Sequence, residues 1–142
     1  MVHRYYVKKE VLDKAIKRAL KYRKIVNKKD GDTYHAEYYV EKVPIDVEIT
    51  PSEGAILFVV CIDALAGGNK EEPLRLSTLN QMNKADWTEG TFYIDEDRKG
   101  SIFYKVLRDK ILIVPPRGEI FLYLEELVMT LKENISYIKN GL

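Results

Sequence analysis

The spacing of apolar side chains changes from that of a helix to that of a strand near residue 33. Apolar residues recur every three or four positions from Val11 to Leu20, which predicts an amphipathic helix over about Lys8 to Val26. Polar and apolar residues then alternate, as in half-buried strands. Three strands are predicted in succession, over Thr33–Glu41, from Pro44 to Thr50, and over Ala55–Ile62. Because short turns join them, we expect an antiparallel meander.

The third of these strands is apolar on both faces, so we expect it to be central and covered on both sides. A second helix is predicted from Pro73 to Lys84, and a hairpin from Thr91–Asp95 and Ser101–Leu107. The last element is an amphipathic helix over Glu119–Lys139, with Asn140-Gly141 as its C-terminal cap. The predicted order is therefore α-β-β-β-α-β-β-α. This order favours a single α+β domain over residues 1–142, with an antiparallel sheet and helices mainly on one face.

The composition is that of a packed protein, with 46% hydrophobic residues in 142. The single cysteine, Cys61, cannot form a disulfide within the chain and lies in an apolar run, where we expect a buried, unreactive thiol. That run, Ala55–Ile62, is the longest, and it is far shorter than the ~20 residues of a membrane-spanning helix. With no secretory signal in the sequence, a cytoplasmic location is expected.

The net charge of +1 conceals a strong asymmetry. Residues 1–29 carry 11 basic and 2 acidic side chains, or +9, whereas the rest of the chain carries 12 basic and 20 acidic side chains, or −8. This distribution excludes a uniformly basic protein that coats nucleic acid. Five of the basic residues form one stripe on the predicted first helix: Lys14, Lys17, Arg18, Lys21 and Lys24. The stripe is consistent with a solvated helix face, an acidic protein partner, or nucleic acid.

The sheet face opposite the helices is the most informative surface. We expect the helices to cover the face that carries Tyr34, Tyr38, Ile45, Val47, Phe92, Ile94, Ile102 and Tyr104. The opposite face would then present five apolar or aromatic side chains: Tyr39, Leu57, Val59, Tyr93 and Phe103. An open patch of this kind usually marks association with a partner. The alternatives are that the third strand presents Ile56, Phe58 and Val60 instead, or that the first helix crosses to cover this face.

Motifs for catalysis, cofactors and metals are absent from the sequence. Only His3 and His35 can serve as imidazole groups, and neither lies in a nucleophile or phosphate-loop motif. Glu37, Asp46 and Glu48 are predicted to lie near His35 on the outward sheet face, but zinc sites normally contain more histidine or cysteine. We therefore expect no catalytic, cofactor-binding or metal-binding residues, and a protein that is not an enzyme.

The element order resembles the type III secretion chaperone-like fold and, within it, the YbjN-like family. Three stretches carry the resemblance: Leu76-Ser77-Thr78-Leu79-Asn80-Gln81-Met82-Asn83, Gly90-Thr91-Phe92-Tyr93-Ile94-Asp95 and Gly100-Ser101-Ile102-Phe103-Tyr104-Lys105. The chain departs from the pattern in the Gly67-Gly68 loop and in the segment Asp109–Gly118. The resemblance implies a non-enzymatic, often dimeric domain that binds protein segments, and it supplies no catalytic residues.

The sequence as a whole therefore predicts a chaperone-like or regulatory protein-binding module. It would act through the open sheet face, on a protein partner or a second copy of itself, and would form a homodimer. The alternative is a nucleic-acid-associated protein that uses the basic stripe. No membrane partner is expected.

Overall fold

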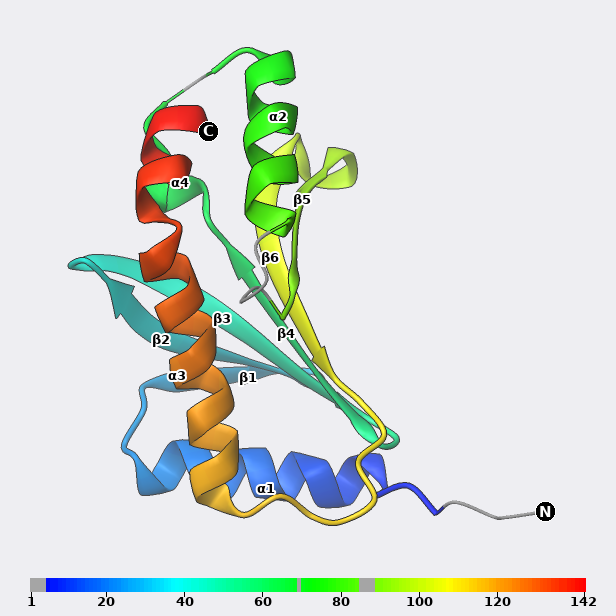
Figure 1. The fold of residues 1–142 in the computed structure, drawn as a ribbon. Coiled ribbons are helices and arrows are strands. Elements are labelled where there is room, and N and C mark those ends of the chain that lie inside the picture. The colour runs from blue at the N-terminus through cyan, green and yellow to red at the C-terminus, as the bar shows by residue number, and fades with distance from the viewer. Residues whose placement is uncertain (1–4, 69, 85–88) are drawn as a thin grey trace.

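The computed structural model describes residues 5–68, 70–84 and 89–142, so His3 and Asn69 lie outside the described residues (Figure 1). The elements follow the order α1 (Lys9–Tyr22), β1 (Asn27–Asp30), β2 (Thr33–Val40), β3 (Val43–Ser52), β4 (Ala55–Cys61), η1 (Asp63–Leu65), α2 (Glu72–Asn83), β5 (Thr91–Asp95), η2 (Glu96–Arg98), β6 (Ser101–Arg108), α3 (Arg117–Glu133) and α4 (Ile135–Gly141), where η marks a short 3-10 turn. This is the predicted α+β order with one strand added and the last helix divided.

In the described residues, six strands form one antiparallel sheet in the order β1-β2-β3-β4-β6-β5. The register of the sheet agrees with the alternation of apolar and polar residues in the sequence. Apolar residues are paired with apolar residues on the core face: Ala36 with Val47, and Ile49 with Phe58. A shift of one residue would turn every apolar side chain of a strand to the other face. The predicted meander of β2, β3 and β4 and the predicted hairpin of β5 and β6 are both present.

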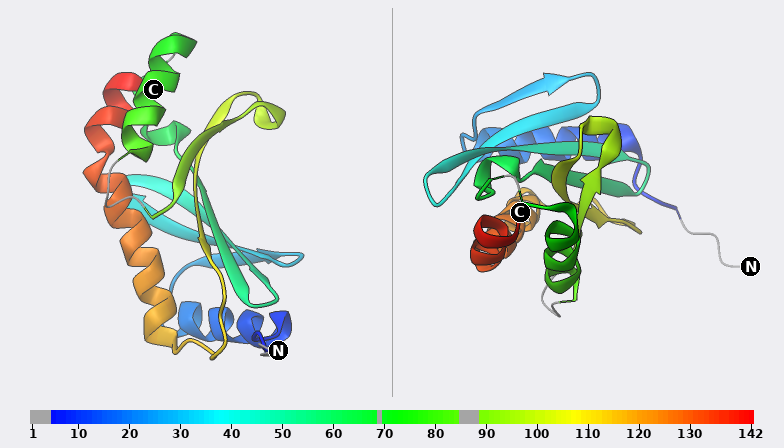
Figure 2. Two further views of the ribbon diagram at one scale, coloured as in Figure 1. Left: turned by 45° about the vertical axis from the view of Figure 1, so that its right-hand side comes forward. Right: turned by 90° about the horizontal axis from the view of Figure 1, so that it is seen from above.

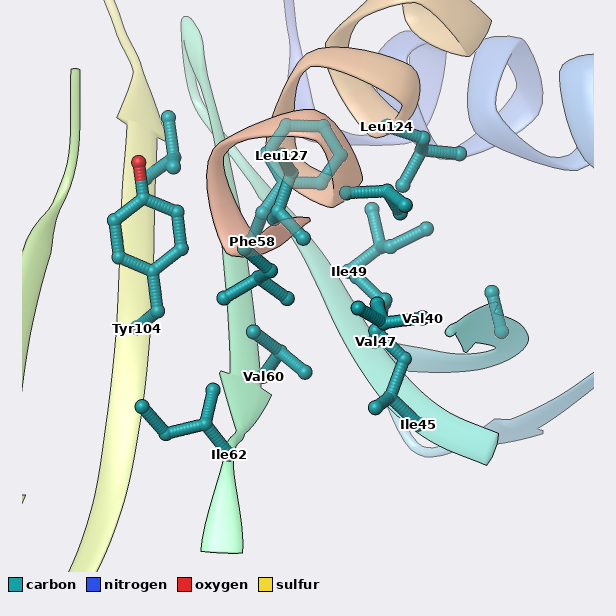
Figure 3. Close-up of a cluster of buried hydrophobic side chains, with 14 of the residues drawn as sticks. Val40, Ile45, Val47, Ile49, Phe58, Val60, Ile62, Tyr104, Leu124 and Leu127 are labelled. Atoms are coloured by element: carbon teal, nitrogen blue, oxygen red, sulfur yellow. The ribbon is translucent and has the colours of Figure 1, made fainter. Parts of the chain in front are cut away.

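One face of the sheet packs against the helices in a single core, and Figure 2 shows α2, α3 and α4 along that face. Figure 3 shows Leu124 and Leu127 of α3 above Phe58 and Ile49 of the sheet, and all four side chains are at most 2% exposed. The first helix also adds its apolar stripe to this core, including Ile16 at 0% exposure. The first helix therefore does not cross to the opposite face.

Strand β1 is the added strand, and the periodicity of the sequence did not predict it. Lys28 and Lys29 pair with His35 and Tyr34 of β2, and Gly31 turns the chain between the two strands with a positive φ of 60°. Every residue of β1 is exposed, so no apolar alternation marks it in the sequence. Lysines on an edge strand discourage pairing with other chains.

The prediction of a single C-terminal helix over Glu119–Lys139 is wrong, because the structure has two helices, α3 and α4, which are divided at Asn134. This residue is 0% exposed, and its side-chain amide donates a hydrogen bond of 2.9 Å to the carbonyl of Thr130. Gly141 belongs to α4 instead of capping it. A Cβ at Gly141 would overlap the side chain of Thr78, so this glycine allows α4 and α2 to approach closely.

The connection between β6 and α3 is held in place by backbone hydrogen bonds. Ile111 donates to the carbonyl of Gly54 at 2.9 Å and accepts from the amide of Val7 at 2.9 Å. The connection thereby ties the segment before α1 to the β3–β4 turn. Among the described residues, no helix combines the length and apolar character that a membrane crossing requires.

Candidate partner-binding face

The outer face of the sheet, opposite the helices, carries Leu57 and Val59 of β4, both half-buried. The expectation that β4 is covered on both sides is therefore wrong, although the strand is central. The alternating partners Ile56, Phe58 and Val60 are at most 1% exposed and face the core. The choice between the two sets of β4 residues is thus settled in favour of Leu57 and Val59 as the outward set.

A hollow of about 530 Å³ lies on this outer face. The exposed lining of this hollow is more polar than apolar, and its three apolar or aromatic side chains are Leu57, Val59 and Tyr93, which we call the apolar floor. They are three of the five residues predicted for partner binding. The polar rim of the hollow consists of Asp30, Thr33, His35, Glu48, Thr50, Arg98 and Lys105. We call this surface the outer hollow. The combination of an apolar floor and a charged rim is the usual composition of a protein-binding surface.

Phe103 was predicted to be open to a partner, but it is only 4% exposed. Tyr93 stacks on it with ring centroids 5.6 Å apart, and the Arg98 guanidinium lies 4.9 Å from the centre of its ring. Glu48 and Asp95, each 3.8 Å from Arg98, hold the guanidinium in this position. Phe103 is therefore covered by Tyr93 and Arg98 and does not present itself to a partner.

Tyr39 is the remaining predicted residue, and it lies outside the outer hollow. It is 58% exposed near the end of β2, where its hydroxyl donates a hydrogen bond of 2.9 Å to Glu37. Sequence reasoning missed Leu107, which is 55% exposed and pairs with Leu57 across the β4–β6 ladder. The alternation that placed Phe103 on this face also places Leu107 there, so the sequence contained the signal.

Cys61 was expected to be buried, and instead it is exposed at the end of β4. Its side chain lies on the outer face because it follows Leu57 and Val59 at intervals of two. Neighbouring atoms desolvate the sulfur and raise the pKa of the thiol. The thiol form therefore predominates at neutral pH, and this form is a poor nucleophile.

Three of the four polar residues predicted to converge beside the first strands do so. The ligand atoms of His35, Asp46 and Glu48 lie within 4.8 Å of one another, and His35 Nδ1 is 2.7 Å from an Asp46 oxygen. The hydrogen bond that the imidazole makes to the Asp46 carboxylate raises the pKa of His35, with smaller contributions from the charges of nearby carboxylates. Glu37 accepts a hydrogen bond from the Tyr39 hydroxyl and does not join this cluster. One imidazole with two carboxylates provides fewer nitrogen or sulfur ligands than zinc sites usually have, so an ion pair accounts for this cluster.

The five residues of the basic stripe are all exposed. Within the described part of the chain, no carboxylate lies within ion-pair distance of any of them. The predicted helix was too long, because α1 ends at Tyr22. Lys24 therefore follows the helix, with a left-handed φ of 54°, and only the other four residues lie on the helix surface.

Comparison with known proteins identifies the fold. No protein family model matches the sequence, and no curated protein matches it. YbjN from E. coli, a protein proposed to be a transcription regulator, matches with a TM-score of 0.61 and 13% identity, over 87% of this chain and 91% of YbjN. A chain of the HopA1–SchA chaperone–effector complex matches with a TM-score of 0.55 and 11% identity, over 89% of this chain and 98% of that one. The predicted resemblance is thus confirmed at the level of fold: the chain has the type III secretion chaperone-like fold that it shares with YbjN.

Proposed function

We propose that this protein is a non-enzymatic, chaperone-like or regulatory protein-binding module, and that its outer hollow holds an extended segment of a partner protein. The observation that carries the proposal is the apolar floor of Leu57, Val59 and Tyr93, which the helices leave uncovered. A structural neighbour that forms a chaperone–effector complex supports the same class of function. A cytoplasmic location remains part of the expectation.

The concave shape of the site favours a slender segment over a second copy of the same face. A twofold dimer places a surface patch against the identical patch, and two hollows cannot fill each other. An extended chain presents alternate side chains to one side, so its apolar residues would meet the floor while its backbone and other side chains meet the rim. Glu48, Arg98 and Lys105 provide both signs of charge for these polar contacts.

A peptide-display selection tests this proposal. Peptides selected on the wild-type protein are measured against Tyr93→Asp and against the matched control Tyr39→Asp, which changes an exposed tyrosine of the same face outside the hollow. We expect binding to weaken at least about tenfold in Tyr93→Asp, because the charge must be desolvated against the apolar floor. Binding to Tyr39→Asp should stay at the wild-type level. Equal effects of the two substitutions would contradict the proposal.

A homodimer is the second part of the proposal. The helical side offers apolar side chains for such contacts, since Leu74 and Leu76 of α2 and Tyr137 of α4 are 46–48% exposed. Light scattering after size exclusion should give twice the 16.5 kDa of one chain. A mass of one chain at all concentrations up to the millimolar range would refute the dimer and leave the outer hollow untouched.

Association with nucleic acid is a second candidate function. It is favoured by the basic stripe, which is exposed and has no ion-pair partner among the residues that the structure describes. If the stripe contacts phosphates, affinity for mixed DNA and RNA should fall steeply as salt rises. Replacing Lys14, Lys17 and Lys21 together by Gln should then remove the binding, whereas Lys110→Gln should not. Fluorescence anisotropy measures both, and the absence of binding at low salt eliminates this candidate.

A further inference from the structure

A second hollow, of about 450 Å³, lies between α2, the tip of the β5–β6 hairpin and the residue that follows α4. Figure 1 shows α2, α4 and the hairpin tip at the same end of the molecule. The walls of the hollow come from the Gly67-Gly68 loop, from α2, from the hairpin tip and from Leu142. Polar atoms make up most of its lining. The loop is one of the two places where the chain departs from the YbjN-like pattern, and the proposed protein-binding role does not involve it.

Three cations from three separate segments line this hollow: Lys70 after the loop, Arg75 of α2 and Lys99 of the hairpin tip. In the part of the chain that the structure describes, none of them has a carboxylate within 4.0 Å. Asp63 is the only acidic side chain in the lining, and one of its oxygens already accepts the amide of Ile102 at 2.9 Å. Among the described side chains of the lining, three are cationic and one is acidic, so positive charge is in excess.

Arg75 is held in a fixed position. Its Nη2 donates a hydrogen bond of 2.9 Å to the carbonyl of Gly100, and its Nε is buried with no partner among the described residues. A half-buried guanidinium without a counter-ion has lost part of its hydration and gained no ion pair. An anion in the hollow would supply the missing ion pair through charge-assisted hydrogen bonds to the guanidinium.

The backbone around the hollow is constrained as well. A Cβ at Gly67 would overlap the backbone carbonyl of Lys139, so the loop lies directly against α4. At the hairpin tip, Lys99 and Gly100 both have positive φ, and their amides donate to the carbonyls of Glu96 and Asp95 at 3.2 and 3.0 Å. The cations are thus presented by segments of defined geometry, which reduces the entropy that a ligand must overcome.

We propose that this second hollow binds a doubly charged oxyanion, namely the phosphate group of a small phosphate monoester. Arginine and lysine together are the usual ligands of phosphate oxygens, and the hydroxyl of Ser101 adds a neutral donor to the lining. The two negative charges of a dianion balance three cations better than the one negative charge of a carboxylate does. The site is independent of the outer hollow, so either can exist without the other.

Nuclear magnetic resonance titration of the ¹⁵N-labelled protein tests this proposal. Inorganic phosphate and glycerol 3-phosphate are added at constant ionic strength, with potassium chloride as the reference. We expect saturable shifts of the amide signals of Lys99, Gly100 and Ser101. Tighter binding of glycerol 3-phosphate identifies a monoester as the ligand, whereas equal binding identifies free phosphate as a sufficient one.

The variants separate a site from general attraction to a basic surface. Lys99→Asn should weaken binding at least about tenfold, because it removes one charge-assisted contact. Asparagine tolerates the left-handed backbone at this position. Lys110→Asn is the matched control, since Lys110 is also an exposed lysine with a positive φ, of 55°, but lies outside the hollow. Shifts that do not saturate, or equal losses in the two variants, would overturn the proposal.

Discussion

The amide side chain of Asn83 completes the exposed edge of β5, and its removal should destabilise the protein measurably. Its Nδ2 donates to the carbonyl of Phe92 at 2.8 Å, and its Oδ1 accepts the amide of Phe92 at 2.7 Å. Asn83 therefore takes the place of a neighbouring strand at Phe92, where β5 turns its backbone groups away from β6. Two hydrogen bonds at about 0.5–1.5 kcal/mol each give a loss of about 1–3 kcal/mol for Asn83→Ala.

Urea denaturation followed by circular dichroism measures this loss. The matched control is Asn80→Ala, which makes the same change on an exposed residue of the same helix and so corrects for helix propensity. With a typical urea dependence of about 1–3 kcal/mol per molar, the midpoint of Asn83→Ala should fall about 1 M below that of the control. Asn83→Asp should lose at least as much, because a carboxylate would face the carbonyl of Phe92. Equal midpoints for the two alanine variants would refute the reasoning.

Three further predictions concern the core, the helix contact and pH. Ile16→Ala should lower the free energy of unfolding by about 2–5 kcal/mol, whereas Val11→Ala, on the exposed side of the same helix, should change it by about 0.5 kcal/mol or less. Gly141→Ala should cost about 1–3 kcal/mol in the same urea assay, because a Cβ would force α4 away from α2. The raised pKa of His35 means that its bond to Asp46 stabilises the protein below the ordinary histidine pKa, and that this contribution is lost as pH rises through the folded value. The difference in unfolding free energy between wild type and His35→Gln should therefore shrink between pH 5.5 and 8.5, and a constant difference would contradict the assignment.

The elements that could be predicted are those in which buried apolar residues recur at the spacing of a helix or of a strand. The alternation through Tyr34 and Ala36 predicts β2, because Tyr34, Ala36 and Val40 face the core and their immediate neighbours along the strand face the outer side. An exposed edge strand such as β1 has no such period, so only its pairing with β2 identifies it. The break at Asn134 was hidden because Ile138 continues the apolar stripe of α3 across a one-residue interruption.

The same distinction applies to the candidate site. Strand parity places Tyr93 on the outer face but leaves two alternating sets of residues open for β4. The burial of Ile56, Phe58 and Val60 selects Leu57 and Val59 as the outward set, and these two residues line the hollow together with Tyr93. Phe103 is covered because the Arg98 guanidinium lies over its ring. The position of Arg98 depends on the conformation of the β5–β6 hairpin tip, which no local sequence pattern predicts. The second hollow likewise joins segments that are distant in the sequence, and folding alone brings their charges together.

The central claim is that a partner segment lies in the outer hollow, and the most direct test is a chemical-shift map of a selected peptide on the ¹⁵N-labelled protein. The account predicts that the amides of Leu57, Val59, Tyr93 and Lys105 shift together and saturate, while those of the basic stripe on α1 stay unchanged. Shifts confined to α1, or to the exposed side of α2 and α4, would contradict it.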